Sequence, residues 1–149
     1  MMFRLNKKVE YALIALMEMS TMESGGPVTA KMLVEKTGLP GALMGKILQS
    51  LNRKGIISSI QGVKGGYRIA KDFESVRLKE IIEAVEGPVA IADCFQNPEN
   101  CVDKSGCELK NPLKIIQNDI NRYLMGISLG YIKSLYGKNV KEPEIEAVT

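Results

Sequence analysis

Three cysteines, Cys94, Cys101 and Cys107, are the residues of this chain best suited to chemistry. Six residues separate the first pair and five separate the second. Thiolates are soft ligands for zinc and for iron–sulfur clusters, but structural zinc sites usually use cysteine pairs about two to four residues apart. The wider spacing favours a loop that wraps around a larger metal-containing group.

A site with three thiolates leaves one coordination position to be filled. The chain contains no histidine, so a carboxylate, a solvent molecule or a residue of a partner subunit would have to complete the site. Two other interpretations stay open at this point. The cysteines are three unrelated thiols, or they form a redox-active thiol sensor that binds no metal.

The first third of the chain has the pattern of a helix-turn-helix. Apolar periodicity and capping residues predict helices over residues 6–22, 29–36 and 40–54. Thr29 is a good N-cap for the second helix, and Gly38 ends it because glycine tolerates the left-handed conformation. Two helices joined by a turn of about four residues are typical of this motif.

A short β-hairpin is predicted directly after the third helix. Two runs rich in β-branched or aromatic residues, Ile56–Ile60 and Gly66–Ala70, flank a glycine-rich turn at Gln61–Gly65. A hairpin in this position is the wing of a winged helix-turn-helix. The predicted fold class is therefore mainly α with a small β-hairpin wing, followed by a long C-terminal dimerisation helix.

The rest of the chain divides into three parts. A fourth helix is predicted from Ser75 to Gly87, and the stretch that holds the cysteines then loses the helical period, which predicts a loop. A final helix carries an apolar stripe that would be buried against a second subunit, or against the chain's own first helix. The predicted organisation is a DNA-binding domain at 1–87, a cysteine loop at 88–111, a dimerisation helix at 112–137 and a flexible tail at 138–149.

Charge is distributed unevenly along the chain. Residues 1–71 carry a net charge of +7 and residues 72–149 a net charge of −4. A basic first half suits a face that binds nucleic acid, although chance clustering of surface lysines would give the same balance.

Several classes of protein are excluded by what the sequence lacks. No apolar run reaches the roughly 18 residues of a membrane span, and no signal peptide is recognised, so a cytoplasmic protein without a membrane partner is expected. No histidine, no nucleophile–base pair and no phosphate-binding loop support catalysis. Neither an enzyme nor a small-molecule substrate is expected.

The start of the third helix is expected to enter the major groove of DNA. Lys46 suits guanine and Gln49 suits adenine, while Gly41 and Gly45 either let the backbone approach the DNA or are merely tolerated at exposed sites. Each lysine is either a DNA contact or a solvated surface charge. The predicted contacts are Lys7, Lys8, Lys31, Gly41, Ala42, Gly45, Lys46, Gln49, Gln61 and Lys64, with Met44 facing the groove and Arg53 and Lys54 as further phosphate contacts.

Four segments of the sequence carry a resemblance to one family. They are Leu5–Leu13, the wing segment Gly62–Ala70, Leu78–Pro88 ahead of the cysteines, and Ile127–Leu129. Over roughly residues 3–136 the chain resembles the IscR–NsrR family of winged-helix iron–sulfur cluster transcriptional regulators. The resemblance implies a homodimer with crossing C-terminal helices. It also implies a double-stranded DNA operator whose affinity depends on the state of the cluster.

The resemblance further implies how an iron–sulfur cluster would be held, with the three cysteines as metal ligands. Some members add a histidine three residues after the third cysteine, where this chain has Lys110. Others add an acidic residue of the partner's first helix, where this chain has Glu10. Glu10 of the partner subunit is therefore the expected fourth ligand, and similarity to nitric-oxide sensors favours a 4Fe–4S over a 2Fe–2S cluster.

Three departures from the family pattern limit which properties of the family are expected of this chain. The first cysteine gap is one residue longer than usual, Gln61 replaces a frequent wing arginine, and Gly45 replaces a frequent recognition-helix glutamate. The operator is therefore expected to differ from those of other members. The expected function is a regulator whose cluster senses nitric oxide, redox state or iron supply. The alternative is a cluster-free regulator of the same fold that senses thiol oxidation or a small molecule.

Overall fold

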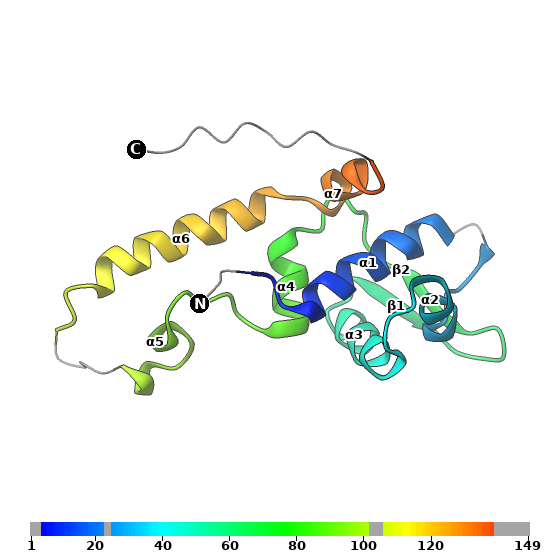
Figure 1. Cartoon of the computed structure of the whole chain (residues 1–149), viewed down its shortest axis with the longest axis horizontal. Coiled ribbons are helices and arrows are strands. Elements are labelled where there is room, and N and C mark those ends of the chain that lie inside the picture. Colours follow the sequence, from blue (N-terminus) through cyan, green and yellow to red (C-terminus); the bar gives the residue numbers. More distant parts are fainter. Residues whose placement is uncertain (1–3, 23–24, 102–105, 139–149) are drawn as a thin grey trace.

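A computed structural model describes residues 4–22, 25–101 and 106–138 of the chain. Its first three helices are α1 (Lys7–Met22), α2 (Ala30–Thr37) and α3 (Gly41–Arg53) (Figure 1). They confirm the predicted helix-turn-helix. Among the described residues, no helix is long and apolar enough to cross a membrane.

The turn between α2 and α3 is fixed at both ends by local chemistry. The Thr29 hydroxyl accepts a hydrogen bond from the backbone N–H of Met32 at 3.2 Å, which caps α2. Gly38 ends α2 in the left-handed conformation, with φ of +71°. The sequence indicates Pro40 as the first helical residue of α3. In the structure Pro40 is instead the N-cap residue of this helix.

The core of the domain lies where α1, α2 and α3 meet. Leu16 of α1, Leu33 of α2, and Leu48 and Leu51 of α3 are completely buried in one cluster. Met44 joins that cluster with 1% exposure, so the prediction that its side chain faces the DNA groove is wrong. Its position on the helix turns it inward with Ile47, Leu48 and Leu51.

The predicted wing is a two-stranded antiparallel hairpin. Strand β1 (Ile57–Ile60) pairs with β2 (Gly66–Ile69), and Ile57 lies opposite Ile69. Backbone hydrogen bonds between Val28 and Tyr67, at 2.8 and 2.9 Å, tie the hairpin to the segment that follows α1. A Cβ atom at Gly66 would lie 2.8 Å from the Val28 carbonyl oxygen, so this close approach requires glycine.

The fourth helix, α4 (Leu78–Glu86), begins three residues later than the sequence indicates. Ser75 belongs to a preceding turn, in which its hydroxyl donates to the carbonyl of Asp72 at 2.7 Å. The Glu80 carboxylate accepts from the backbone N–H of Arg77 at 2.7 Å, and this contact fixes the first turn of α4.

The predicted loop at 88–111 contains two short helical elements. They are α5 (Asp93–Gln96), which holds Cys94, and the 3₁₀-helix η2 (Pro98–Asn100). The Asn97 side chain caps η2 by accepting from the backbone N–H of Glu99 at 3.1 Å. Elements of three or four residues are too short for an apolar period, so the sequence pattern did not reveal them.

The predicted single helix at 112–137 is wrong, because the structure has two helices there. They are α6 (Lys110–Gly126) and α7 (Leu129–Leu135), separated by an extended Ile127. The break lets Ile127 accept from the backbone N–H of Leu78 at 2.8 Å. Ser128 then caps α7, since its hydroxyl accepts from the backbone N–H of Tyr131 at 3.0 Å.

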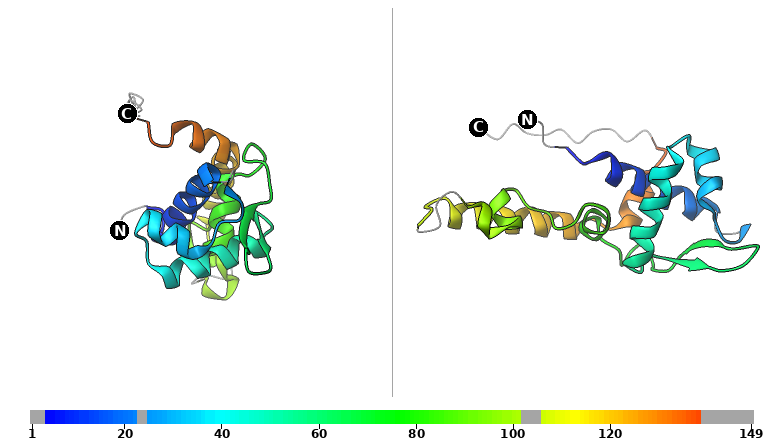
Figure 2. Two further views of the ribbon diagram at one scale, coloured as in Figure 1. Left: turned by 90° about the vertical axis from the view of Figure 1, so that its right-hand side faces the viewer. Right: turned by 90° about the horizontal axis from the view of Figure 1, so that it is seen from below.

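The break at Ile127 divides the C-terminal part between two surroundings. Helix α7 packs on the winged domain, and its Leu129 is completely buried in the main core. Helix α6 instead extends away from the domain formed by α1–α4 and the hairpin (Figure 2). Apart from Lys138, the predicted flexible tail at 138–149 lies outside the described residues.

Candidate DNA interface and cysteine segment

Helix α3 has one buried face and one exposed face, as a recognition helix requires. Ala42, Lys46, Gln49 and Arg53 are exposed and follow one another at helical spacing. A Cβ atom at Gly45 would meet nothing within 4 Å, so no contact inside the described chain requires glycine there. Gly41 is likewise exposed, and a Cβ atom there would make an ordinary contact with Val34 at 3.7 Å.

A basic pocket lies beside the exposed face of α3. It has a volume of about 270 Å³ and is lined by residues of α1, α3 and α4, among them Lys8, Lys46 and Arg53. Among the described residues, no acidic side chain lines it. Glu86 lies just outside the lining, with its carboxylate 3.9 Å from the Lys8 ammonium. Three cations around a small hollow favour binding of a phosphate group.

The other predicted DNA contacts are distributed over three elements. Lys31 is exposed on α2, and Gln61 and Lys64 are exposed on the turn of the wing. Lys7 lies in the first turn of α1 and pairs with Glu10, whose carboxylate is 2.9 Å away. A hydrogen bond with this carboxylate raises the pKa of the Lys7 ammonium.

The three cysteines are all half-buried, but they lie on different parts of the segment. Cys94 is in α5, Cys101 follows η2, and Cys107 precedes α6. Residues 102–105, between the second and third cysteine, lie outside the described residues. Within the described part of the chain, no three cysteine or carboxylate side chains come together as a metal site.

The donor chemistry of the segment nevertheless fits an iron–sulfur cluster. Three half-buried thiols on one segment match the soft ligands that such clusters need. Glu10 is half-exposed on α1 and lines a separate hollow of about 290 Å³ with residues 4–7. The Glu10 side chain is 42% exposed to solvent at this position.

Gln117 is a site residue that the sequence analysis did not identify. It is the one buried residue of α6, all of which the structure describes, and it is 8% exposed. Its side-chain oxygen accepts from the backbone N–H of Ile91 at 2.8 Å, and its side-chain nitrogen donates to the Val89 carbonyl at 2.9 Å. The sequence signal that could have identified it was a polar glutamine among the inward-facing apolar residues of α6, between Leu113 and Leu124.

A large apolar groove lies between α6 and the rest of the chain. It has a volume of about 810 Å³ and is lined by the start of α1, the end of α4, and α6. Helix α6 also leaves large apolar side chains exposed, namely Ile115, Ile116, Tyr123 and Met125. Ile116 and Tyr123 also line the groove, and an apolar groove beside exposed apolar side chains is typical of an interface between subunits.

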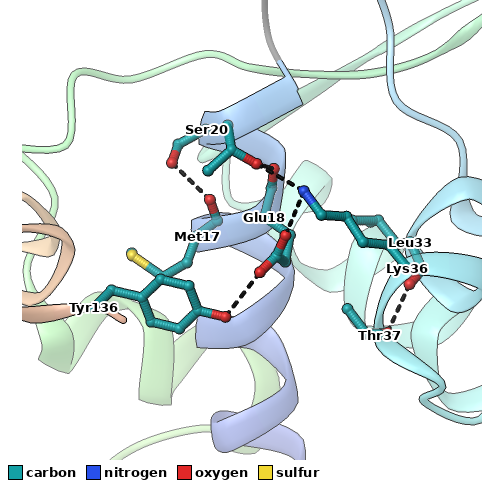
Figure 3. A network of polar contacts seen from close by, with 8 residues as sticks. Met17, Glu18, Ser20, Leu33, Lys36, Thr37 and Tyr136 are labelled. Atoms are coloured by element: carbon teal, nitrogen blue, oxygen red, sulfur yellow. Dashed lines mark hydrogen bonds and ion pairs between the residues drawn. The ribbon is translucent and has the colours of Figure 1, made fainter. Parts of the chain in front are cut away.

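A polar network joins α1, α2 and the residue that follows α7 (Figure 3). The Glu18 carboxylate lies 2.7 Å from the Lys36 ammonium and accepts from the Tyr136 hydroxyl at 2.9 Å. The bond with Lys36 holds the pKa of Glu18 below its ordinary value, although burial acts in the opposite direction. The network therefore connects the first helix of the helix-turn-helix to the C-terminal part of the chain.

Comparison of the sequence with known proteins identifies one family, and comparison of the structure with solved structures finds proteins of the same fold as this chain. Residues 5–134 match the family described as Rrf2, iron-dependent transcriptional regulator. The chain is 28% identical over 127 residues to the transcriptional regulator IscR of Escherichia coli, which covers 85% of this chain and 78% of IscR. It is also 28% identical over 114 residues to a putative rrf2-like regulator of Rhodobacter capsulatus, covering 71% of this chain and 76% of that protein.

Two solved structures share the fold at low sequence identity. The IscR of T. potens superposes with a TM-score of 0.67 at 20% identity, covering 95% of this chain and 94% of that one. CymR of B. subtilis, described as a global cysteine regulator, superposes with a TM-score of 0.68 at 20% identity. That superposition covers 89% of this chain and 98% of CymR.

Proposed function

The chain belongs to the Rrf2 family of iron-dependent transcriptional regulators, and we propose that it binds its operator as a homodimer under the control of an iron–sulfur cluster. Members of this family are DNA-binding regulators and not enzymes. The observation that carries the finer proposal is the set of three half-buried thiols on the segment between α4 and α6.

The exposed face of α3 enters the major groove of the operator in this proposal. Lys46 and Gln49 face the base edges, while Lys8 and Arg53 hold a phosphate in the basic pocket. The start of α3 approaches the DNA through small side chains, and the remaining contacts come from exposed side chains on α2 and the wing. These residues are Gly41, Ala42 and Gly45, then Lys31, Gln61 and Lys64.

The homodimer forms through α6 and the apolar groove beside it. Four large apolar side chains of α6 are exposed in the single chain, and burying such surfaces stabilises an interface by about 25 cal/mol per Å². Two copies of the winged domain would then present two α3 helices to a pseudo-palindromic operator.

Cys94, Cys101 and Cys107 would hold the cluster, and Glu10 of the partner subunit would supply the fourth ligand. When bound, the cluster supplies iron that reacts with nitric oxide or changes with redox state and iron supply. Glu10 must first leave Lys7, but this ion pair is exposed to solvent and therefore contributes little to stability. The dimer would have two arrangements that differ in operator affinity. The cluster then shifts operator affinity only by the difference between its binding free energies in these two arrangements.

Native mass spectrometry of the full chain purified without oxygen tests this proposal. We expect a dimer that carries one cluster per subunit. Glu10→Gln should lose the cluster or release it faster, because an amide is a weaker ligand than a carboxylate. Glu35→Gln, which changes an exposed carboxylate on α2, is the matched control and should keep it. A dimer without iron or sulfide after reconstitution would refute the proposal.

A second candidate is a cluster-free regulator that senses thiol oxidation or a small molecule. The three half-buried thiols would serve it as well, because thiols that reach the surface can be oxidised without any metal. Under this alternative, operator affinity changes when the thiols are oxidised, and it does so in protein that contains no iron.

A further inference from the structure

Gln117 forms a direct polar link between α6 and the backbone that leads into the cysteine segment. Its side-chain oxygen accepts a hydrogen bond from the N–H of Ile91, and its side-chain nitrogen donates one to the carbonyl of Val89. The second hydrogen of its side-chain nitrogen has a partner in the side-chain oxygen of Asn121, at 3.3 Å. Both side-chain N–H groups and the side-chain oxygen therefore have a partner in a site with 8% exposure.

The position of this link gives it a role beyond helix packing. Ile91 lies three residues before Cys94, and Val89 directly follows the Gly87–Pro88 end of α4. Because Gln117 is the one buried residue of α6, α6 is held at this level by two directional hydrogen bonds and not by buried apolar side chains. A shift of residues 89–91 relative to α6 would break both bonds together.

We propose that Gln117 is a positioning residue that holds the start of the cysteine segment on α6 and so transmits the state of that segment to the helix. The positioning itself depends only on the contacts described above. The transmission of a cluster state rests on the proposed function. Gln117 does not bind the cluster, and it acts through the placement of Cys94.

Three variants separate this role from general packing. Gln117→Leu removes both hydrogen bonds while keeping a side chain of similar size. Gln117→Asn keeps the amide but is one methylene shorter, so it preserves polarity and folding while losing reach to residues 89–91. Asn118→Ala changes the exposed neighbour on the same helix and is the matched control.

Hydrogen–deuterium exchange of the full-length apoprotein is the first readout. We expect the Ile91 amide to exchange at least about tenfold faster in Gln117→Leu and Gln117→Asn than in the wild type or Asn118→Ala. Alkylation of the Cys94 thiol should accelerate in the same two variants. Wild-type exchange at Ile91 and wild-type alkylation at Cys94 in folded Gln117→Asn would overturn the proposal.

The visible circular dichroism of the reconstituted protein is the second readout, because it reports the geometry of the cluster and not the stability of the fold. A changed spectrum in Gln117→Asn, with the spectrum of Asn118→Ala unchanged, supports transmission through Gln117, and an unchanged spectrum refutes it. If the wild type takes up no cluster, the proposed function fails, while exchange at Ile91 still decides whether Gln117 positions the segment.

Discussion

Arg53→Met is the substitution that most directly tests whether the basic pocket beside α3 holds a DNA phosphate. Arg53 is exposed at the end of α3 and lines the pocket with Lys8 and Lys46. Methionine keeps most of the aliphatic stem and removes the charge, so we expect the fold to be unaffected. The loss should weaken binding to all DNA sequences alike, because phosphate contacts carry no sequence information.

The magnitude follows from the number of phosphates released. Each contact with B-DNA contributes about 0.9 to the slope of log K against log salt. The slope should therefore become shallower by roughly 1.8 in a dimer that loses two contacts. Lys8→Met should have a smaller effect, because Glu86 lies 3.9 Å from the Lys8 ammonium and already offsets part of its charge. Glu86→Gln should for the same reason steepen the slope.

Fluorescence anisotropy with a labelled operator, measured over a salt series, provides the assay. Gln49→Ala is the matched control within the same pocket, since it removes no charge and should change sequence preference while leaving the slope unchanged. Lys114→Met, on α6, should change neither the sequence preference nor the salt slope. An Arg53→Met slope equal to that of the wild type would refute the assignment of this pocket to a phosphate.

Four further predictions concern the stability and assembly of the protein. Leu48→Ala should lower the free energy of unfolding by about 2–5 kcal/mol in urea titrations, because it opens a cavity in a completely buried site; a loss below 1 kcal/mol in the same titration would contradict the packing described. Gly66→Ala should cost about 1–3 kcal/mol and weaken operator binding, because the new Cβ atom would crowd the Val28 carbonyl at 2.8 Å; wild-type stability and affinity would show that the hairpin does not need this approach. The folded state lowers the pKa of Glu18, so its contribution to stability is present above the unfolded value of 4.5 and is lost as pH falls through the folded value; Glu18→Gln should reduce the slope of stability against pH below 4.5, and an unchanged slope would count against the network. Tyr123→Asp should convert the dimer to a monomer in analytical ultracentrifugation, because it places a charge on the exposed apolar face of α6; a dimer of unchanged affinity would exclude this face.

The winged helix-turn-helix was predictable because its signals are local and repeated. Apolar residues recur at helical spacing through α1 and α3, and Thr29 and Gly38 mark the ends of α2 by chemistry that needs no tertiary contact. The hairpin follows from two β-branched runs around a glycine-rich turn. Two of the four segments that carry the family resemblance, Leu5–Leu13 and Gly62–Ala70, lie in this part of the chain.

The C-terminal part was less predictable because long-range contacts decide it. The apolar period continues through Ile127, but pairing of this residue with Leu78 breaks the helix in two. Gly126 and Ser128 are weak helix formers that hinted at the break. A pattern of periodicity cannot show where a distant strand-like segment will compete for backbone hydrogen bonds.

The candidate site was predictable by residue type and less so by placement. The three cysteines were identified from their soft thiols and spacing, and their assignment as ligands stays a prediction. Met44 was assigned to the groove although its helical position turns it into the core. Gln117 was missed because its role depends on the backbone of Val89 and Ile91, residues far from it in sequence.

Operator affinity measured on cluster-loaded and cluster-free portions of one anaerobic preparation, at fixed salt, tests most directly whether the cluster controls DNA binding. We expect the two dissociation constants to differ about 5- to 150-fold, the usual range for coupling between two sites. The difference should disappear in a variant in which Cys94, Cys101 and Cys107 are all replaced by serine. Equal affinities of the two wild-type forms would contradict control by the cluster and leave a regulator whose signal acts elsewhere.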